Sequence, residues 1–329
     1  GFPKEKTLSI GVINGRDIWS VNLAEAISTI STVKQLTQAE NLWISSSCSL
    51  QHVPVSKNIE QKLPQELFDH LAFADEKIRE IAHITYYIQK GSWLKEGLVS
   101  NSMKVIEALA THPIRKNERV EKALAELAPN DFQRYVPFAE RQQIQKNALK
   151  LPYFPTTTIG SFPQSAEVKK TRSAWRKGEL TDAAYAQFVK EETARWLHIQ
   201  EEIGLDVLVH GEFERTDMVE YFGEHLTGFA FTDYAWVVSY GSRCVKPPII
   251  YGDVEWTHEM TVKEVVEAQA LTDKYVKGML TGPVTILNWS FVRNDISREL
   301  VALQIGYALR QEVAALETAG IKIIQVDEP

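Results

Sequence analysis

Four carboxylates follow short apolar runs in the second half of the chain. Glu212 and Glu214 come after the run Leu205–Val209, and Asp327 and Glu328 come after a similar run near the C-terminus. A strand end is also where any barrel turns polar, so each carboxylate alone fits a structural role equally well. Glu212 and Asp327, the first carboxylate after each run, are the stronger candidates. Neighbouring carboxylates gain from a shared positive partner, which predicts a site for an ammonium group or a cation.

A third short run ends in Ile159, Gly160 and Ser161. Glycine lets a ligand approach the backbone closely, and N–H groups aimed at a ligand carboxylate would suit this position. The alternative is a tight turn that only ends a strand.

Two further candidates lie between these runs. Arg243 and Cys244 belong to the irregular segment Gly241–Pro248. The planar guanidinium of arginine matches a carboxylate or a heterocycle edge, whereas a single cysteine is more often a small buried apolar group. Trp289 could stack on a flat ligand ring or fill the core.

Histidine and cysteine do not form a metal-binding pattern. His210 lies at a strand end, and a ring satisfied by neighbouring backbone is the preferred interpretation. Cys48 and His52 are close in sequence but have no third partner within reach. The sequence therefore predicts no metal site in this span.

The elements around these residues repeat one unit. A helical pattern over 185–203 ends at Gly204, and an apolar strand over 205–212 follows it. Further strands are predicted within 156–163, 237–253, 276–286 and 321–327, with a long helix over 296–319. This α/β order predicts the first five units of a (β/α)8 barrel in residues 151–329, which are too few for the complete barrel of about 250 residues.

The first part of the chain holds a smaller copy of this pattern. Strands are predicted near residues 8–14 and 41–50, with a helix between them and a long amphipathic helix over 63–89. Helical patterns over 99–110 and 120–127 follow. We therefore expect residues 1–89 to be the end of another barrel, 90–150 a helical connector, and 151–329 the second barrel, both barrels being incomplete.

Composition limits the partners. The 329 residues carry a net charge of −7 without a basic cluster, which argues against nucleic acid as a partner. Apolar runs are too short to cross a membrane. The chain has two cysteines, which gives no disulfide framework and makes the cytoplasm the expected location.

Several segments together resemble one family, the cobalamin-independent methionine synthases. The resemblance covers the whole second half and, less strongly, residues 9–19, 42–55 and 71–81. The motifs are Thr158–Pro163, Asp206–Glu212, Asp217–Glu224, Ser239–Pro248, Lys277–Thr285 and Ile324–Pro329. The resemblance implies two face-to-face barrels joined by a helical connector. The active site would lie in the second barrel, and Cys48 would be a relic of a lost metal site in the first.

The reaction implied is methyl transfer from 5-methyltetrahydrofolate, as a polyglutamate, to homocysteine, with zinc holding the homocysteine thiolate. By the motifs, Ile159, Gly160 and Ser161 would receive the homocysteine carboxylate. Glu212 and Asp327 would hold its ammonium group and also lie near the folate. The remaining folate contacts would be Arg243, Cys244 and Trp289.

This chain departs from the family pattern in one respect. The family's zinc ligands and its acid/base histidine lie beyond the fifth strand, so no catalytic or metal-binding residue is expected within this span. We expect an internal portion of a methyltransferase, monomeric in full length, that is inactive by itself. The alternatives are a non-catalytic module that binds folate or homocysteine, and a related zinc-free barrel decarboxylase, which the Gly241–Pro248 segment disfavours.

Overall fold

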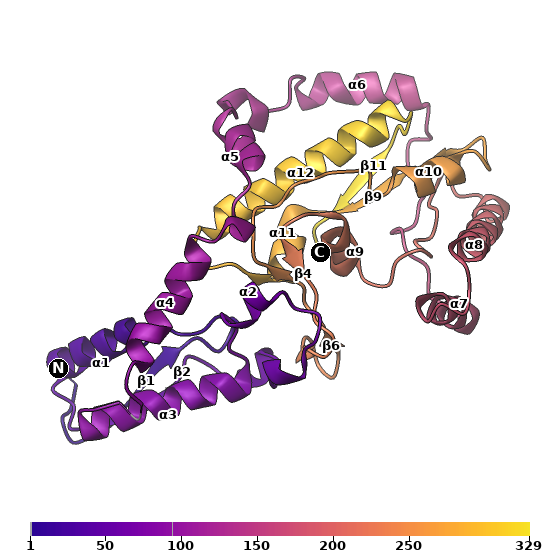
Figure 1. Cartoon of the computed structure of the whole chain (residues 1–329). Helices are drawn as coiled ribbons and strands as arrows, with labels where there is room; N and C mark the ends of the chain where they lie inside the picture. The colour runs from indigo at the N-terminus through magenta and orange to yellow at the C-terminus, as the bar shows by residue number, and fades with distance from the viewer. Residues whose placement is uncertain (1, 94) are drawn as a thin grey trace. The chain divides into compact units, whose positions relative to one another are not determined.

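The computed structural model describes residues 2–93 and 95–329, and the chain in it forms two compact units (Figure 1). Unit 1 comprises Gly1–Asn117, Gly228–Asp253 and Leu287–Val301, and unit 2 comprises Glu118–Thr227, Val254–Ile286 and Ala302–Pro329. Gly1 and Leu94, which fall in the predicted first domain and connector, lie outside the described residues.

Unit 1 begins with a parallel strand pair. The strands β1 (Thr7–Ile13) and β2 (Asn41–Ser46) are joined through the helix α1 (Leu23–Thr37), as the apolar periodicity predicts. The Asn22 side chain accepts hydrogen bonds from two N–H groups of the first turn of α1, which fixes where that helix begins. The helix α3 (Ala74–Lys90) packs against both strands, and α4 (Leu98–Ala110) packs against α1. The shared core is Ile10, Ile13, Leu23, Ala26, Ile30 and Ile84.

The long helix predicted over 63–89 is interrupted in the structure. It divides into α2 (Gln65–Phe68) and α3, because residues 71–73 are buried and the N–H of Ala72 donates to the carbonyl of Ile18. Extended backbone at this point lets Leu71 and Phe73 enter a second apolar cluster with Ile18.

The rest of unit 1 consists of short elements. β7 (Ile249–Ile250) pairs with β10 (Phe291–Val292) in parallel and with β4 (Phe229–Ala230) antiparallel. A hairpin joins β5 (Val237–Val238) to β6 (Cys244–Val245). The 3-10 turns are η1 (Leu50–His52), η2 (Lys57–Ile59) and η3 (Pro113–Arg115).

The two longest helices lie wholly or mostly in unit 2, and their predicted limits are confirmed closely. α8 (Asp182–Glu202) ends before Gly204, at φ +83°, and α12 (Arg298–Thr318) ends before Gly320, at φ +91°. Left-handed φ at these positions favours glycine. The other helical elements are α5 (Glu118–Ala125), η4 (Pro129–Phe132), α6 (Phe138–Leu149), α7 (Ala166–Arg176), α9 (Met218–His225), α10 (Val262–Gln269) and α11 (Pro283–Asn288), whose last two residues belong to unit 1.

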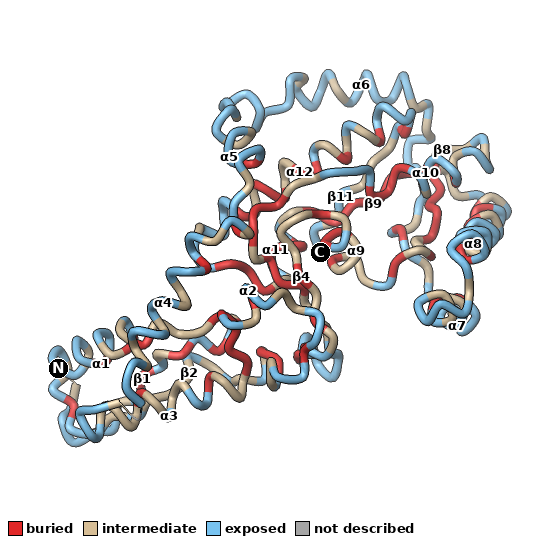
Figure 2. The backbone as a smooth tube through the Cα atoms, viewed as in Figure 1, coloured by how far each residue is buried: buried red, intermediate tan, exposed pale blue. Residues whose placement is uncertain are grey.

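Four extended segments of unit 2 run in parallel. Residues 156–161 join the segment of β3 (Val207–Leu208) through the bridge of Ser161 with Gly211. β3 pairs with β8 (Tyr275–Val276), and β9 (Gly278–Thr281), one residue further on, pairs with β11 (Ile324–Asp327). Figure 2 marks β9 as buried, and all of its residues are. Parallel pairing brings the carboxyl ends of these segments to one edge.

The predicted row of five neighbouring strands is not what the sheets show. The segment 237–253, predicted as the third strand, belongs to unit 1, where β10 and β4 occupy the two edges of β7. In unit 2, β3 pairs directly with β8, so no place for a third strand remains between them. The fold is α/β, and the sheets do not establish a (β/α)8 barrel. No helix among residues 2–93 and 95–329 has both the length and the apolar character needed to cross a membrane.

Candidate substrate-binding site

Glu212 lies at the carboxyl end of the β3 segment, in a turn whose backbone has a conformation that few residues adopt. Gly211 has φ +97° and Glu212 itself has φ +59°. The Glu212 side chain retains 14% of its exposed area. A non-glycine residue with positive φ is uncommon and is often found where function requires it. The geometry therefore sets Glu212 apart from the carboxylates around it.

The tripeptide Ile159–Ser161 lies against Glu212. A Cβ atom added to Gly160 would come within 2.7 Å of the Glu212 Oε1 and 2.5 Å of the Met279 Cε. Any residue other than glycine at position 160 would therefore displace these two side chains. Ile159 is 72% exposed, and Gly160 is buried. Both segments contain residues that the sequence analysis singled out, and in the structure they lie side by side.

Asp327 reaches the same tripeptide through Gln325, a residue that the sequence pattern did not single out. The Gln325 amide donates to the carbonyl of Ile159 at 3.0 Å and to Asp327 Oδ1 at 2.5 Å. The Lys277 ammonium donates to the carbonyl of Thr158 and to Gln325 Oε1, each at 2.6 Å. Burial lowers the pKa of Lys277, and the nearby Asp327 carboxylate opposes that shift. Glu212 thus lies beside Gly160, and Asp327 is joined to Ile159 through Gln325, so carboxylates from two separate segments lie close to the tripeptide.

The other two of the four carboxylates, Glu214 and Glu328, have structural partners. Glu214 Oε1 lies 3.1 Å from His210 Nε2 and accepts from Arg215 Nε at 2.9 Å. Glu328 accepts from two backbone N–H groups at the start of α11, at 2.9 and 2.7 Å. His210 therefore contacts a carboxylate, whereas its sequence position suggested a backbone partner. Its buried Nδ1 has no hydrogen-bond partner in the described structure.

The residues predicted to contact folate fall in both units. Arg243 and Cys244 are exposed in the β5–β6 hairpin of unit 1. The Arg243 guanidinium lies over the Trp289 ring at 5.7 Å from its centroid, a cation–π contact within the same unit. Glu212 and Asp327 belong to unit 2. The joint folate site stays a prediction.

Zinc does not fit the residues described. Over residues 2–93 and 95–329, no group of three or more His, Cys, Asp or Glu side chains is arranged to hold a metal ion. Both cysteines, Cys48 and Cys244, are free thiols. A structural or catalytic zinc site needs at least three protein ligands, and the described part of the chain does not supply such a set.

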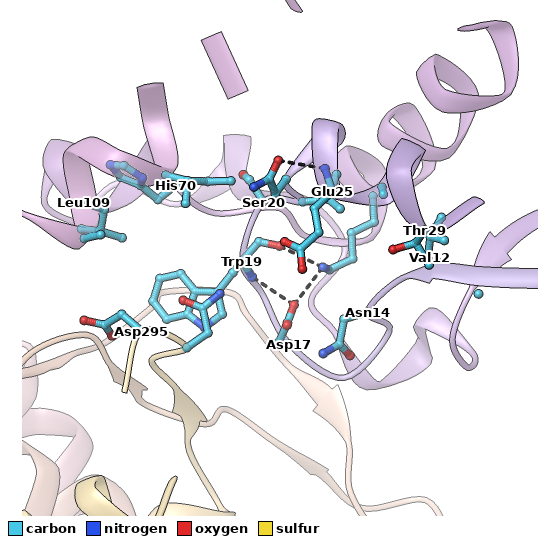
Figure 3. Close-up of a pocket in the computed structure, with 18 of the residues that line it drawn as sticks. Val12, Asn14, Asp17, Trp19, Ser20, Glu25, Thr29, His70, Leu109 and Asp295 are labelled. Carbon is cyan, nitrogen blue, oxygen red and sulfur yellow. Dashed lines mark hydrogen bonds and ion pairs between the residues drawn. The ribbon is translucent and has the colours of Figure 1, made fainter. Parts of the chain in front are cut away.

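Unit 1 contains a separate cavity of about 720 Å³ that none of the predicted site residues lines. Figure 3 shows the Asp17 carboxylate between the backbone N–H of Trp19 and an ammonium group, which belongs to Lys77. Lys77 is 1% exposed and lies 3.1 Å from Asp17. At another part of the lining, Arg115 pairs with Asp295 at 2.6 Å. Both buried cations are thus paired within the cavity lining itself.

Glu80, next to this cavity, should make the stability of the chain depend on pH. Burial raises the pKa of Glu80 to about 7. Between the usual pKa and pH 7 the unfolded chain releases this proton while the folded chain keeps it, so stability falls as the pH rises through this window. Glu80→Gln keeps an acceptor for the N–H of Val21 and removes the charge. We expect the free energy of unfolding of this variant to exceed that of the unsubstituted chain by about 1–3 kcal/mol at pH 8 and to be almost the same at pH 4.5.

Urea unfolding at the two pH values measures this difference. Glu66→Gln, on the exposed side of α2, is the control and should shift little at either pH. An equal gain in the free energy of unfolding of Glu80→Gln at pH 4.5 and at pH 8 would contradict a raised pKa of Glu80.

Two family models match the chain. The model described as cobalamin-independent synthase, catalytic domain, matches residues 154–329, and that described as cobalamin-independent synthase, N-terminal domain, matches residues 1–38. The catalytic-domain match contains the tripeptide 159–161 together with Glu212 and Asp327.

Curated relatives agree with these matches. The chain is 55% identical to the 5-methyltetrahydropteroyltriglutamate–homocysteine methyltransferase of Bacillus subtilis (strain 168) and 54% identical to that of Bacillus mycoides (strain KBAB4). Each alignment covers 100% of this chain and 43% of the relative, so the chain spans less than half the length of these relatives.

A solved structure is also similar in part. The B12-independent methionine synthase from Shewanella sp. W3-18-1, in complex with selenomethionine, is 26% identical with a TM-score of 0.46, covering 53% of this chain and 51% of that one. The family assignment depends on the sequence matches, which extend over both units and include the candidate site. This chain belongs to the cobalamin-independent synthase family.

Proposed function

We propose that this chain supplies the substrate-binding residues of a zinc-dependent methyltransferase. The longer protein would transfer the methyl group of 5-methyltetrahydrofolate polyglutamate to homocysteine and form methionine. The observation that carries the proposal is that two carboxylates lie close to the tripeptide Ile159–Ser161, Glu212 beside Gly160 and Asp327 through Gln325. Relatives of this chain are named for this methyl transfer, and the chain spans 43% of their length.

The proposed roles follow from charge. The N–H groups around Gly160 and Ser161 would donate to the homocysteine carboxylate, because a glycine leaves the backbone accessible. Glu212 and Asp327 would accept from the homocysteine ammonium group. Opposite charges at the two ends of the amino-acid moiety would orient the molecule and leave its thiol projecting away from the tripeptide.

For the folate we propose Arg243, Cys244 and Trp289 of unit 1 as contacts. The contact of Arg243 with the Trp289 ring supports a flat site in unit 1 where a pterin ring would stack.

Zinc would hold the homocysteine thiolate in the longer protein. Since the described residues include no fitting donor set, we propose that this chain alone binds substrates without transferring the methyl group. We also propose the domain limits 1–89, 90–150 and 151–329, and a cytoplasmic, monomeric full-length enzyme.

Glu212→Gln tests the site. In the full-length methyltransferase this change keeps the side-chain shape and removes the charge that faces the ammonium group. We expect homocysteine affinity to fall by about 1.5–3 kcal/mol, or roughly tenfold to a hundredfold. Isothermal titration calorimetry with L-homocysteine measures the affinity directly. Glu317→Gln, on the exposed side of α12, is the matched control and should bind normally. Unchanged affinity of Glu212→Gln would remove Glu212 from the site.

A further inference from the structure

Arg215 lies between two carboxylates of unit 2, and one of these is Glu212. Its Nε is 2.9 Å from Glu214 Oε1 and 3.7 Å from Glu212 Oε2. The residue is only 5% exposed. The rings of Tyr221 and Phe222 lie 5.0 and 5.5 Å from the guanidinium carbon, which restricts where this side chain can move.

Glu214 keeps Arg215 in this position. Burial alone would raise the pKa of Glu214, but His210 and Arg215 outweigh burial and hold that pKa well below its usual value. Burial likewise disfavours the charge of Arg215, yet Glu214 and Glu212 together raise the pKa of Arg215. The guanidinium is therefore firmly paired with Glu214, and Glu212 is its second, more distant carboxylate.

The backbone that carries these residues is held at three points. Gln200 bonds both the N–H and the carbonyl of Val209, each at 2.9 Å. Arg172 donates to the carbonyl of Phe213, and Gln164 donates to the carbonyl of Arg215. The turn with positive φ at Glu212 lies between these attachments, so its backbone cannot readily rotate Glu212 away.

We infer that Arg215 is a positioning residue that orients the Glu212 carboxylate toward the ammonium group of the bound amino acid. The inference rests on the proposed function. A separation of 3.7 Å is long for a direct hydrogen bond. Arg215 therefore attracts the Glu212 carboxylate by charge but does not donate a hydrogen bond to it. Glu212 then keeps oxygens available to the ligand, while Glu214 satisfies most of the charge of Arg215.

A purely structural role of Arg215 makes a different prediction. If Arg215 only stabilised unit 2, its replacement would affect binding to the same extent whether or not residue 212 carried a charge. If it acts through Glu212, the effect must disappear once Glu212 is neutral. A double-mutant cycle separates these two cases.

The cycle compares Arg215→Lys, Glu212→Gln and the double variant in the full-length methyltransferase, with L-homocysteine as the titrated ligand. Lysine keeps a cation for Glu214 but lacks the Nε–H group of arginine, which is the group nearest to both carboxylates. We expect Arg215→Lys to weaken homocysteine binding about three- to tenfold, and the double variant to bind no more weakly than Glu212→Gln. Arg195→Lys, an exposed arginine paired with Glu192 at 3.3 Å, is the matched control and should bind normally.

A second variant covers the case in which Arg215→Lys does not fold, which thermal melting reveals. Glu214→Gln keeps the shape of the side chain beside Arg215 and removes its charge. The guanidinium should then move toward Glu212 and form a closer ion pair with it. Homocysteine binding should therefore weaken again, but only in variants in which residue 212 is charged. Unchanged binding, or losses that add to that of Glu212→Gln, would overturn the positioning role. Absence of homocysteine binding by the unsubstituted protein, or normal binding by Glu212→Gln, would instead overturn the proposed function and this inference with it.

Discussion

Glu312→Ala should lower the free energy of unfolding by about 3–5 kcal/mol, the largest stability loss we expect from one side chain in unit 2. Glu312 is 0% exposed. Its two oxygens accept four hydrogen bonds, from Trp256 Nε1 at 2.8 Å, the N–H of Met260 at 2.9 Å, and the N–H and hydroxyl of Thr261 at 2.7 and 2.8 Å. Alanine would leave four donors without this partner, in a place that water reaches poorly.

The location of this carboxylate explains why the loss should be large. Thr261 is the N-cap residue of α10, and its own side chain makes no capping hydrogen bond. Glu312, on α12, supplies the acceptor for that helix start, so one side chain both attaches α12 to the segment before α10 and begins α10.

Urea unfolding of the variants measures the effect. Glu312→Gln keeps one acceptor oxygen and should lose about 1–3 kcal/mol, less than Glu312→Ala. Glu317→Gln, exposed on the same helix, should stay within about 0.5 kcal/mol of the unsubstituted chain. A loss below about 1 kcal/mol for Glu312→Ala would show that other groups or water satisfy these donors.

Much of the local structure could be predicted from the sequence because it depends on neighbouring residues. Apolar spacing locates α1, α8 and α12, and the glycines that end the last two lie where a left-handed φ is needed. The parallel pair β1–β2 also follows, since two apolar strands joined by one helix have few other arrangements.

Strand partners could not be predicted with the same success. A short apolar run shows that a strand is buried but does not identify its neighbour, because pairing depends on residues far away in the chain. Ile249–Ile250 therefore looks like one more strand of the second half, although it pairs in unit 1. The interruption of the helix at Leu71 has a similar cause, since only contacts with distant residues such as Ile18 reveal it.

The sequence indicated those candidate site residues that lie at a strand end or at a glycine needed for an unusual backbone conformation. Glu212, Gly160 and Asp327 are of this kind. Gln325 was missed, although alternation along a strand places it on the same face as Asp327, and that spacing could have indicated it. Arg215 carries no such local signal, because its role depends on distances to two carboxylates across a turn.

Gly160→Ala should weaken homocysteine binding by the full-length methyltransferase at least about a hundredfold, the largest functional effect we expect. Gly160 has φ +145°, a conformation that residues with a Cβ rarely adopt. The added Cβ would lie 2.7 Å from Glu212 Oε1 and 2.5 Å from Met279 Cε, so both flexible side chains must move. The chain can accommodate the methyl group, but only by displacing the carboxylate proposed to hold the ammonium group and by altering the backbone proposed to bind the carboxylate.

Gly204→Ala separates this displacement from backbone strain alone. Gly204 also has positive φ, +83°, but a Cβ there would meet no atom within 4 Å. Both variants should lose about 1–2 kcal/mol of stability from strain, measured by urea unfolding, because alanine disfavours positive φ. Only Gly160→Ala should lose homocysteine affinity in calorimetric titration. Equal affinity of the two variants would mean that the Glu212 carboxylate can leave its observed position without consequence, and Glu212 would then have no part in binding the substrate.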